Sequence, residues 1–150
     1  MKPILIVANT PSKNAKQLAG SVLRGVNLSG HPAILKEPLE TTAEDVLNCS
    51  AIIIGTTENF GYMSGQIKDF FERVYYPCLE QTEALPWALY VKAGLDGTGA
   101  TLSVEKIVKG LKWKAVQPPL LLKGEFDERF LDECETLGSG MAEGIKLGIF

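Results

Sequence analysis

Short polar side chains gather directly after the first apolar run of the chain. Thr10, Ser12 and Asn14 offer hydroxyl and amide groups, and Lys13 lies among them. A helix that starts here adds unpaired N–H groups and the positive end of its dipole. This combination favours a site for a phosphate monoester. The alternative is that Ser12 or Asn14 only caps the helix, which needs a single side chain.

Two common phosphate motifs are absent from this segment. It lacks the Gly-Lys-Ser/Thr ending of a P-loop, and it contains no glycine for a G-x-G-x-x-G turn. The hydrogen-bond donors to a phosphate would therefore be short side chains and backbone N–H groups, and not the backbone of a glycine-rich loop.

A second candidate segment runs from Gly55 to Gly65, after another apolar run. Phe60, Tyr62 and Met63 are apolar where a surface loop would be polar. Aromatic and thioether groups pack well on a flat ring system, so the segment favours a large planar ligand. A hydrophobic plug over the sheet edge is the alternative.

A third candidate segment is the loop that contains Gly94, Gly97 and Gly99. Glycines let backbone approach a ligand closely. The pattern alone is weak, because glycine loops are common. Its expected position, at the end of a strand next to the second segment, gives it more weight.

Alternating apolar runs and helical periods predict the elements that position these segments. Continuous apolar runs are typical of strands buried on both faces, and spacings of three and four are typical of helices. The predicted strands are 4–8, 33–36, 51–55, 87–91 and 120–122, and the predicted helices are 14–26, 42–48, 64–79, 101–111 and one that Asp127 caps.

This alternation predicts an α/β fold in one domain, residues 1–150. The expected architecture is a doubly wound three-layer sandwich around a five-stranded parallel sheet with strand order 2-1-3-4-5. Ligands of such sheets bind at the carboxyl ends of the strands, near the switch point between the first and third strands. All three candidate segments fall at that edge.

Composition narrows the classes of function. The net charge of -3 and the scattered Lys and Arg residues argue against nucleic acid. A single histidine, His31, excludes a multi-histidine metal site, and we expect no metal. The cysteines, Cys49, Cys78 and Cys134, have no short spacing and are expected to be small buried thiols. The N-terminal apolar run is short and no stretch would span a membrane, so a cytoplasmic protein is expected.

Two segments resemble the flavodoxin superfamily, and more closely its flavodoxin-like NAD(P)H-dependent oxidoreductases. They are Thr10-Pro11-Ser12-Lys13-Asn14 and the stretch from Glu58 to Phe71, in which an aromatic-glycine turn precedes Ser64-Gly65 and a helix. The resemblance covers the whole chain in length and element order. It implies the fold predicted above and FMN as the cofactor.

The resemblance also implies how FMN would be held. It places the ribityl phosphate on Thr10, Ser12 and Asn14 with backbone help from Ala15, while Lys13 either pairs with the phosphate or reaches solvent. It places the isoalloxazine between the second and third segments. The implied cofactor-binding residues are Thr10, Ser12, Lys13, Asn14, Ala15, Thr57, Glu58, Asn59, Phe60, Gly61, Tyr62, Gly94, Leu95, Gly97, Thr98 and Gly99.

The third segment departs from the electron-carrying flavodoxins, which usually shield the outer flavin face with an aromatic side chain. Residues 94–100 contain none. An open face favours an NAD(P)H-dependent reductase of a quinone, a flavin or a similar acceptor, with NADPH or NADH as donor. A flavodoxin-type carrier that serves a redox protein, and a flavin-free regulatory protein, remain open. A homodimer is possible, as in related reductases, and no catalytic side chain is assigned because the flavin does its own chemistry.

Other chemistries on this architecture lack their residues. There is no Cys-x5-Arg phosphatase loop, no aspartate at the end of the first or third strand as in a receiver domain, and no G-x-S-x-G elbow. Glu58 is the one acid between Gly55 and Gly65, and solvent exposure at a loop tip is its simplest interpretation.

Overall fold

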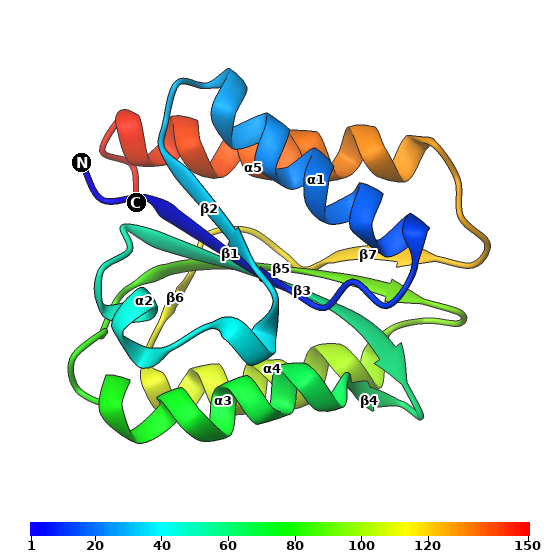
Figure 1. Cartoon of the computed structure of the whole chain (residues 1–150), viewed down its shortest axis with the longest axis horizontal. Coiled ribbons are helices and arrows are strands. Elements are labelled where there is room, and N and C mark those ends of the chain that lie inside the picture. Colours follow the sequence, from blue (N-terminus) through cyan, green and yellow to red (C-terminus); the bar gives the residue numbers. More distant parts are fainter.

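The computed structural model describes all residues, Met1–Phe150. A single sheet lies between two layers of helices (Figure 1). The elements in chain order are β1 (Ile4–Ala8), α1 (Lys13–Leu28), β2 (Ala33–Lys36), the 3₁₀ helix η1 (Pro38–Glu40), α2 (Ala43–Leu47), β3 (Ala51–Asn59), β4 (Tyr62–Met63), α3 (Gly65–Cys78), β5 (Pro86–Ala93), α4 (Thr98–Leu111), β6 (Lys114–Ala115), β7 (Leu120–Lys123) and α5 (Arg129–Lys146).

Helices α1 and α5 cover one face of the sheet, and α2, α3 and α4 cover the other (Figure 1). The parallel strands run in the order β2-β1-β3-β5, and β6 and β7 follow on the outer side of β5. The predicted α/β class and the order 2-1-3-4-5 are therefore confirmed. None of the helices is long and apolar enough to cross a membrane.

The sheet has seven strands, where the sequence predicts five. One extra strand is β4, which pairs antiparallel with the end of β3. The other arises because the fifth position is divided: β6 pairs with the start of β5 and β7 with its end. Pro118 and Pro119 lie between the two pieces. Proline has no N–H to donate, so it interrupts the ladder there.

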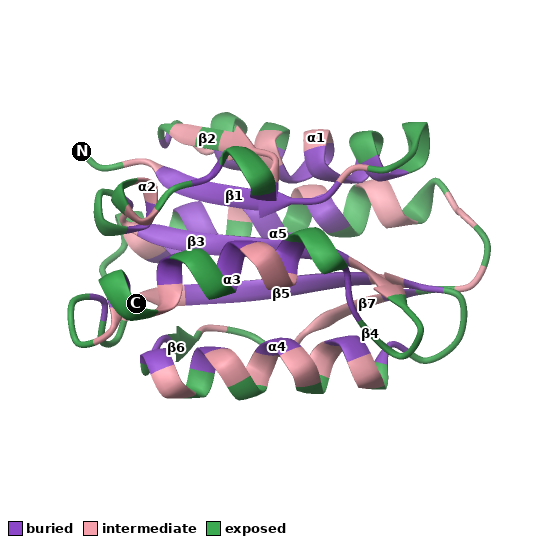
Figure 2. Cartoon of the chain, turned by 60° about the horizontal axis from the view of Figure 1, so that its bottom comes forward, coloured by how far each residue is buried: buried purple, intermediate pink, exposed green.

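Strand β1 and the first six residues of β3 are buried, which explains their continuous apolar sequence (Figure 2). Every residue of β1 is at most 1% exposed. One core lies under α3 and α4 and includes Phe70 and Phe71, and the other lies under α1 and α5 and includes Leu18 and Met141. These two cores hold the carboxyl edge of the sheet in place.

Helices α1 and α5 approach each other closely at two glycines. A Cβ on residue 138 would lie 2.1 Å from the Val22 carbonyl oxygen, and one on residue 25 would lie 2.0 Å from the Glu135 carbonyl oxygen. Glycine at both positions is what lets the two backbones touch. Gly138, which weakens a helix in isolation, lies in the uninterrupted helix α5.

Several helix starts follow the sequence signals, and one differs. The hydroxyl of Ser64 caps α3 by accepting from the Ile67 N–H at 3.2 Å, and Thr42 forms a capping box with Asp45 at the start of α2. Asp127 was expected to cap the last helix. It accepts instead from the Arg129 N–H at 2.8 Å, while the N-cap position falls on Glu128, whose side chain makes no cap.

Candidate functional site

The three segments singled out by sequence lie together at the carboxyl edge of the sheet, on the right in Figure 1. The first joins β1 to α1, the second is the β3–β4 hairpin, and the third joins β5 to α4. They meet because β1, β3 and β5 are adjacent and parallel. Strand β3 is longer than predicted, so residues 56–59 are strand, and α4 starts at Thr98, so Thr98 and Gly99 are helical.

Asn9 ties the first segment to the second. It is buried, its N–H donates to the Gly55 carbonyl at 3.2 Å, and its side-chain amide donates to the Thr57 hydroxyl at 3.2 Å. The Thr57 N–H returns a bond to the Asn9 side chain at 3.3 Å. Sequence reasoning missed Asn9. Its signal is an amide directly after a fully apolar strand, where a polar group needs buried partners.

The backbone at the start of α1 has unused donors. No group of the chain accepts from the N–H of Thr10, Ser12, Lys13 or Asn14. The Ser12 hydroxyl accepts from the Ala15 N–H at 3.1 Å, so Ser12 is the helix cap and the Ala15 N–H is already bonded. Lys13 and Asn14 are exposed. Free N–H groups, a helix dipole and a lysine together fit a phosphate dianion.

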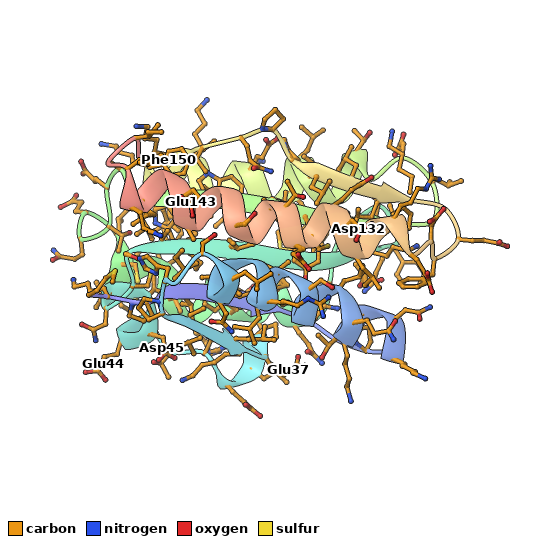
Figure 3. All side chains as sticks on the ribbon, turned by 90° about the horizontal axis from the view of Figure 1, so that it is seen from above. Glu37, Glu44, Asp45, Asp132, Glu143 and Phe150 are labelled. Carbon is orange, nitrogen blue, oxygen red and sulfur yellow. The ribbon has the colours of Figure 1, made fainter.

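The Thr10 side chain is engaged elsewhere in this structure. Its hydroxyl donates to the carboxylate of Glu37, which follows β2 (Figure 3). Two adjoining hollows of about 320 and 370 Å³ lie beside this contact, and both are lined by Thr10, Lys16, Glu37 and Glu40. The predicted role of Thr10 at a phosphate would therefore require its hydroxyl to turn away from an acid.

The β3–β4 hairpin lies on the first turns of α4. The Glu58 carboxylate accepts from the Ala100 N–H at 2.9 Å, and the Met63 N–H donates to the Ser103 hydroxyl at 3.1 Å. The Gly61 carbonyl is so close to Gly99 that a Cβ there would lie 1.8 Å from its oxygen. Glu58 is thus half-buried and bonded rather than a free acid at a loop tip.

The N-terminus of α4 is filled by the chain's own carboxylates. Besides Glu58 on Ala100, Asp96 accepts from the Thr98 N–H at 3.0 Å. This backbone hydrogen bond from Thr98 holds the pKa of the Asp96 carboxyl below its usual value. Two negative groups already neutralise this helix end. The start of α1 is therefore better suited to an anion than the start of α4.

Among the apolar side chains of the candidate segments, Phe60, Tyr62 and Leu95 face outward. Met63, which the sequence assigns to a planar ligand, is instead only 2% exposed and packs in the core under α3 and α4. Phe60 is 107% exposed, Leu95 is 84% exposed and Tyr62 is 42% exposed. Phe60 has φ +53 and Gly61 has φ +67, as a type I′ turn requires. A left-handed Phe costs about 1 kcal/mol and leaves a large ring in water. The turn therefore keeps an aromatic side chain exposed at the site despite both costs.

The cysteine thiols, the strongest potential nucleophiles of the chain, are buried. All three cysteines are free and buried, as expected. Burial raises the pKa of the Cys49 and Cys134 thiols to about 12 and that of Cys78 to about 11. Burial also raises the pKa of Tyr90, whose ring covers Gly55. No three His, Cys, Asp or Glu side chains cluster as metal ligands would.

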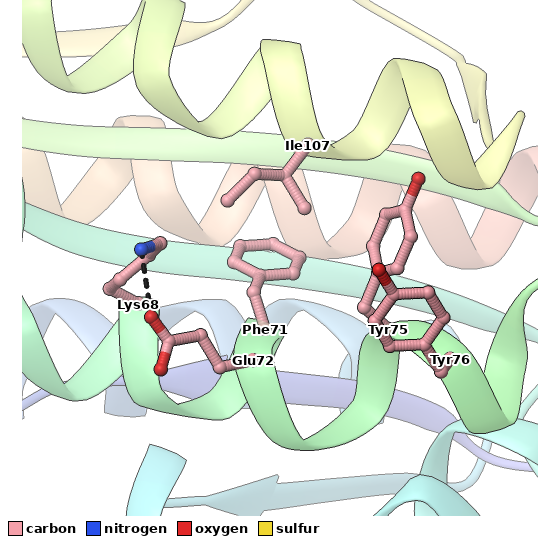
Figure 4. A pocket seen from close by; sticks show the side chains of 6 residues that line it. All are labelled: Lys68, Phe71, Glu72, Tyr75, Tyr76 and Ile107. Carbon is pink, nitrogen blue, oxygen red and sulfur yellow. Dashed lines mark hydrogen bonds and ion pairs between the residues drawn. The ribbon is translucent and has the colours of Figure 1, made fainter.

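A separate groove of about 440 Å³ runs between α3 and α4 (Figure 4). Phe71, Tyr75, Tyr76 and Ile107 line it, and the Lys68 ammonium pairs with the Glu72 carboxylate at 2.9 Å beside them. None of its residues belongs to the three segments. It is not part of the candidate site.

Comparison with known proteins gives one sequence relative and a consistent set of folds. The chain is 35% identical over 75 residues to a flavodoxin of Aquifex aeolicus (strain VF5). The aligned segment spans 49% of this chain and 40% of that flavodoxin. No family model matches.

Solved structures match nearly the whole chain. A flavodoxin from the domain Archaea has a TM-score of 0.84 at 17% identity, over 96% of this chain and 99% of that one. A Streptococcus pneumonia flavodoxin has a TM-score of 0.79 at 15% identity, over 93% and 97%. The rubredoxin oxygen:oxidoreductase of Desulfovibrio gigas has a TM-score of 0.82 at 12% identity, over 99% of this chain and 38% of that one. This protein has the flavodoxin-like fold.

Proposed function

We propose that this protein binds FMN and serves as a flavodoxin-type electron carrier. The observation that carries the proposal is the set of unbonded N–H groups at Thr10, Ser12, Lys13 and Asn14, at the edge where flavodoxin-like sheets bind ligands. The phosphate would lie on these groups, with the Lys13 ammonium and the Asn14 amide beside it. The flavodoxin relative in Aquifex aeolicus supports the same assignment.

The flavin ring would lie between the hairpin and the loop after β5. The hairpin contributes Thr57, Asn59, Phe60, Gly61 and Tyr62 to that boundary. Glu58 bonds the Ala100 N–H and Gly99 lies against the Gly61 carbonyl, so both would act as supports. Gly94, Leu95, Gly97 and Thr98 form the other side, where a short, glycine-rich backbone allows close approach.

FMN, when bound, supplies one- and two-electron redox chemistry, and the protein supplies position and electrostatics. The residues of the first segment hold the anionic end. The exposed Phe60, Tyr62 and Leu95 provide an apolar surface around the ring edge, against which a redox partner protein can pack. A carrier needs such a surface and no acid–base side chain.

A second candidate function is an NAD(P)H-dependent FMN oxidoreductase that reduces a quinone, a flavin or a similar acceptor. The observation that favours it is the loop at 94–97, which has no aromatic side chain to cover the outer face of the ring. An uncovered face leaves room for a nicotinamide or a quinone to stack.

The two candidates separate in one anaerobic experiment on protein reconstituted with FMN. The carrier proposal predicts that NADH and NADPH leave the flavin oxidised, while a reduced redox protein or dithionite reduces it. Rapid bleaching by NADH or NADPH alone would contradict the carrier and support the reductase. Protein that takes up no FMN would remove both functions and favour a flavin-free binding protein.

A further inference from the structure

Strand β4 needs outside support to stay beside β3. Its ladder has only two pairs, Glu58 with Met63 and Asn59 with Tyr62. A two-stranded ribbon of this length is not stable alone in water. The end of β3 is held by the bonds between Asn9 and Thr57, and β4 is held by the buried Met63 side chain and by the bond from the Ser64 N–H to the Thr56 hydroxyl. The contacts of Glu58, Gly61 and Met63 with α4 come in addition, and they set the distance between the hairpin and this helix.

The N-cap residue of α4 has no side chain to cap the helix, and the Glu58 carboxylate takes that role. The N-cap is Gly97 at φ +75, a left-handed position that suits glycine, and glycine has no side chain with which to cap the helix. An N-cap side chain normally accepts from the N–H of the third helical residue, which here is Ala100. Glu58 accepts that bond at 2.9 Å from another part of the chain. Its negative charge also suits the positive end of the helix.

We infer that Glu58 is a positioning residue, which caps α4 from the hairpin and so sets the spacing of the two segments that would flank the flavin ring. The inference rests on the FMN binding proposed above. The Gly61 backbone also contacts Gly99. The spacing between the hairpin and α4 is therefore set by the Glu58–Ala100 hydrogen bond and by this neighbouring backbone contact. Without the bond, only the Met63–Ser103 hydrogen bond and the Gly61–Gly99 contact would hold the hairpin to α4, so the wall that it offers to the ring would be less firmly placed.

Three variants test this role. Glu58→Ala removes the acceptor, and Glu58→Gln keeps an acceptor while it removes the charge. Asp96→Ala is the matched control, because it removes the other carboxylate at the same helix end, whose bond to Thr98 stays within its own loop. The measurements are amide hydrogen exchange at Ala100 and Met63 in flavin-free protein, and the rate constant of FMN release.

Glu58→Ala should increase exchange at both amides and speed FMN release about tenfold, the factor that loss of 1.4 kcal/mol gives. Glu58→Gln should restore protection at both amides and most of the slow release, and Asp96→Ala should leave exchange at Met63 unchanged.

Unchanged exchange in Glu58→Ala would overturn the inference, as would faster exchange with an unchanged release rate. Release from Glu58→Gln as fast as from Glu58→Ala, with protection kept, would show an effect of charge rather than position and would also overturn it. If the wild-type protein binds no FMN, the proposed function fails, while the exchange data still decide whether Glu58 holds the hairpin.

Discussion

At the scale of single residues, the backbone N–H groups after β1 are better placed to bind an anion than the Thr10 and Ser12 hydroxyls, which already have partners within the chain. The sequence points to Thr10, Ser12 and Asn14 because of their side chains. In the structure Ser12 caps α1 and Thr10 donates to Glu37. Sequence reasoning located the segment, but Glu37 is distant in sequence and approaches Thr10 only because β1 and β2 are neighbours.

The cap predicts the effect of Ser12→Ala. Loss of the hydroxyl leaves the Ala15 N–H without its acceptor, so the free energy of unfolding should fall by about 1 kcal/mol. FMN affinity should fall less than tenfold, because the freed N–H becomes a further donor to the phosphate. Urea denaturation and an FMN titration check the two parts. An unchanged unfolding free energy would contradict the cap.

Removing the charge of Glu37 should raise the affinity for FMN. Glu37→Gln removes a negative charge beside the proposed phosphate and a strong acceptor for the Thr10 hydroxyl, so FMN affinity should rise about two- to fivefold, as for a partly exposed charge pair. Glu44→Gln, on α2, is the charge-matched control and should leave affinity unchanged (Figure 3). Weaker binding by Glu37→Gln would place the phosphate elsewhere.

At the scale of elements, the apolar runs predicted every inner strand, and the apolar spacings predicted helices α1, α3, α4 and α5, because burial dictates both periods. The 3₁₀ helix η1 was not predicted. The apolar runs also did not predict the extension of β3 to Asn59 or the hairpin that follows. Thr56, Thr57 and Glu58 carry no apolar signal, and their strand conformation depends on long-range partners such as Asn9 and α4. The divided fifth strand has a local cause in Pro118 and Pro119, although the order of the sheet still follows the prediction.

Alanine substitutions at two glycines of α5 should change the free energy of unfolding in opposite directions. Gly138→Ala places a Cβ 2.1 Å from the Val22 carbonyl oxygen, so α1 and α5 must separate and the unfolding free energy should fall by roughly 1–3 kcal/mol. Gly140→Ala, in the same helix with nothing within 4 Å, should raise it by about 0.5–1 kcal/mol through helix propensity. Equal effects of the two substitutions in chemical denaturation would contradict the close packing of the helices.

At the scale of the whole molecule, the fold buries its three thiols and leaves the carboxyl edge of the sheet exposed, with free backbone N–H groups beside exposed apolar side chains. The class of the sheet followed from the alternation of strands and helices, and its order was chosen among the few topologies that right-handed crossovers allow. The contacts within the edge did not follow from the sequence, since they join residues that only the folded sheet brings together.

The buried thiols predict how stability depends on pH. Folding raises the pKa of Cys49 and Cys134 from 9.0 to about 12, so the folded state keeps protons that the unfolded state loses. Their contribution is complete below pH 9 and should decrease as the pH rises toward 12. Urea unfolding at a series of alkaline pH values measures the decrease. Cys49→Ala should lose less stability over the same range, and an equal loss would contradict the assignment.

The central claim is that the backbone after β1 holds a phosphate. The most direct measurement is amide NMR of the flavin-free protein titrated with FMN and, separately, with riboflavin. We predict that FMN shifts the amide signals of Thr10, Ser12, Lys13 and Asn14 and binds at least about a hundredfold tighter than riboflavin, since two charged hydrogen bonds are worth about 3 kcal/mol or more. Equal affinity for the two flavins, or FMN binding that leaves these four amides unmoved, would contradict the account.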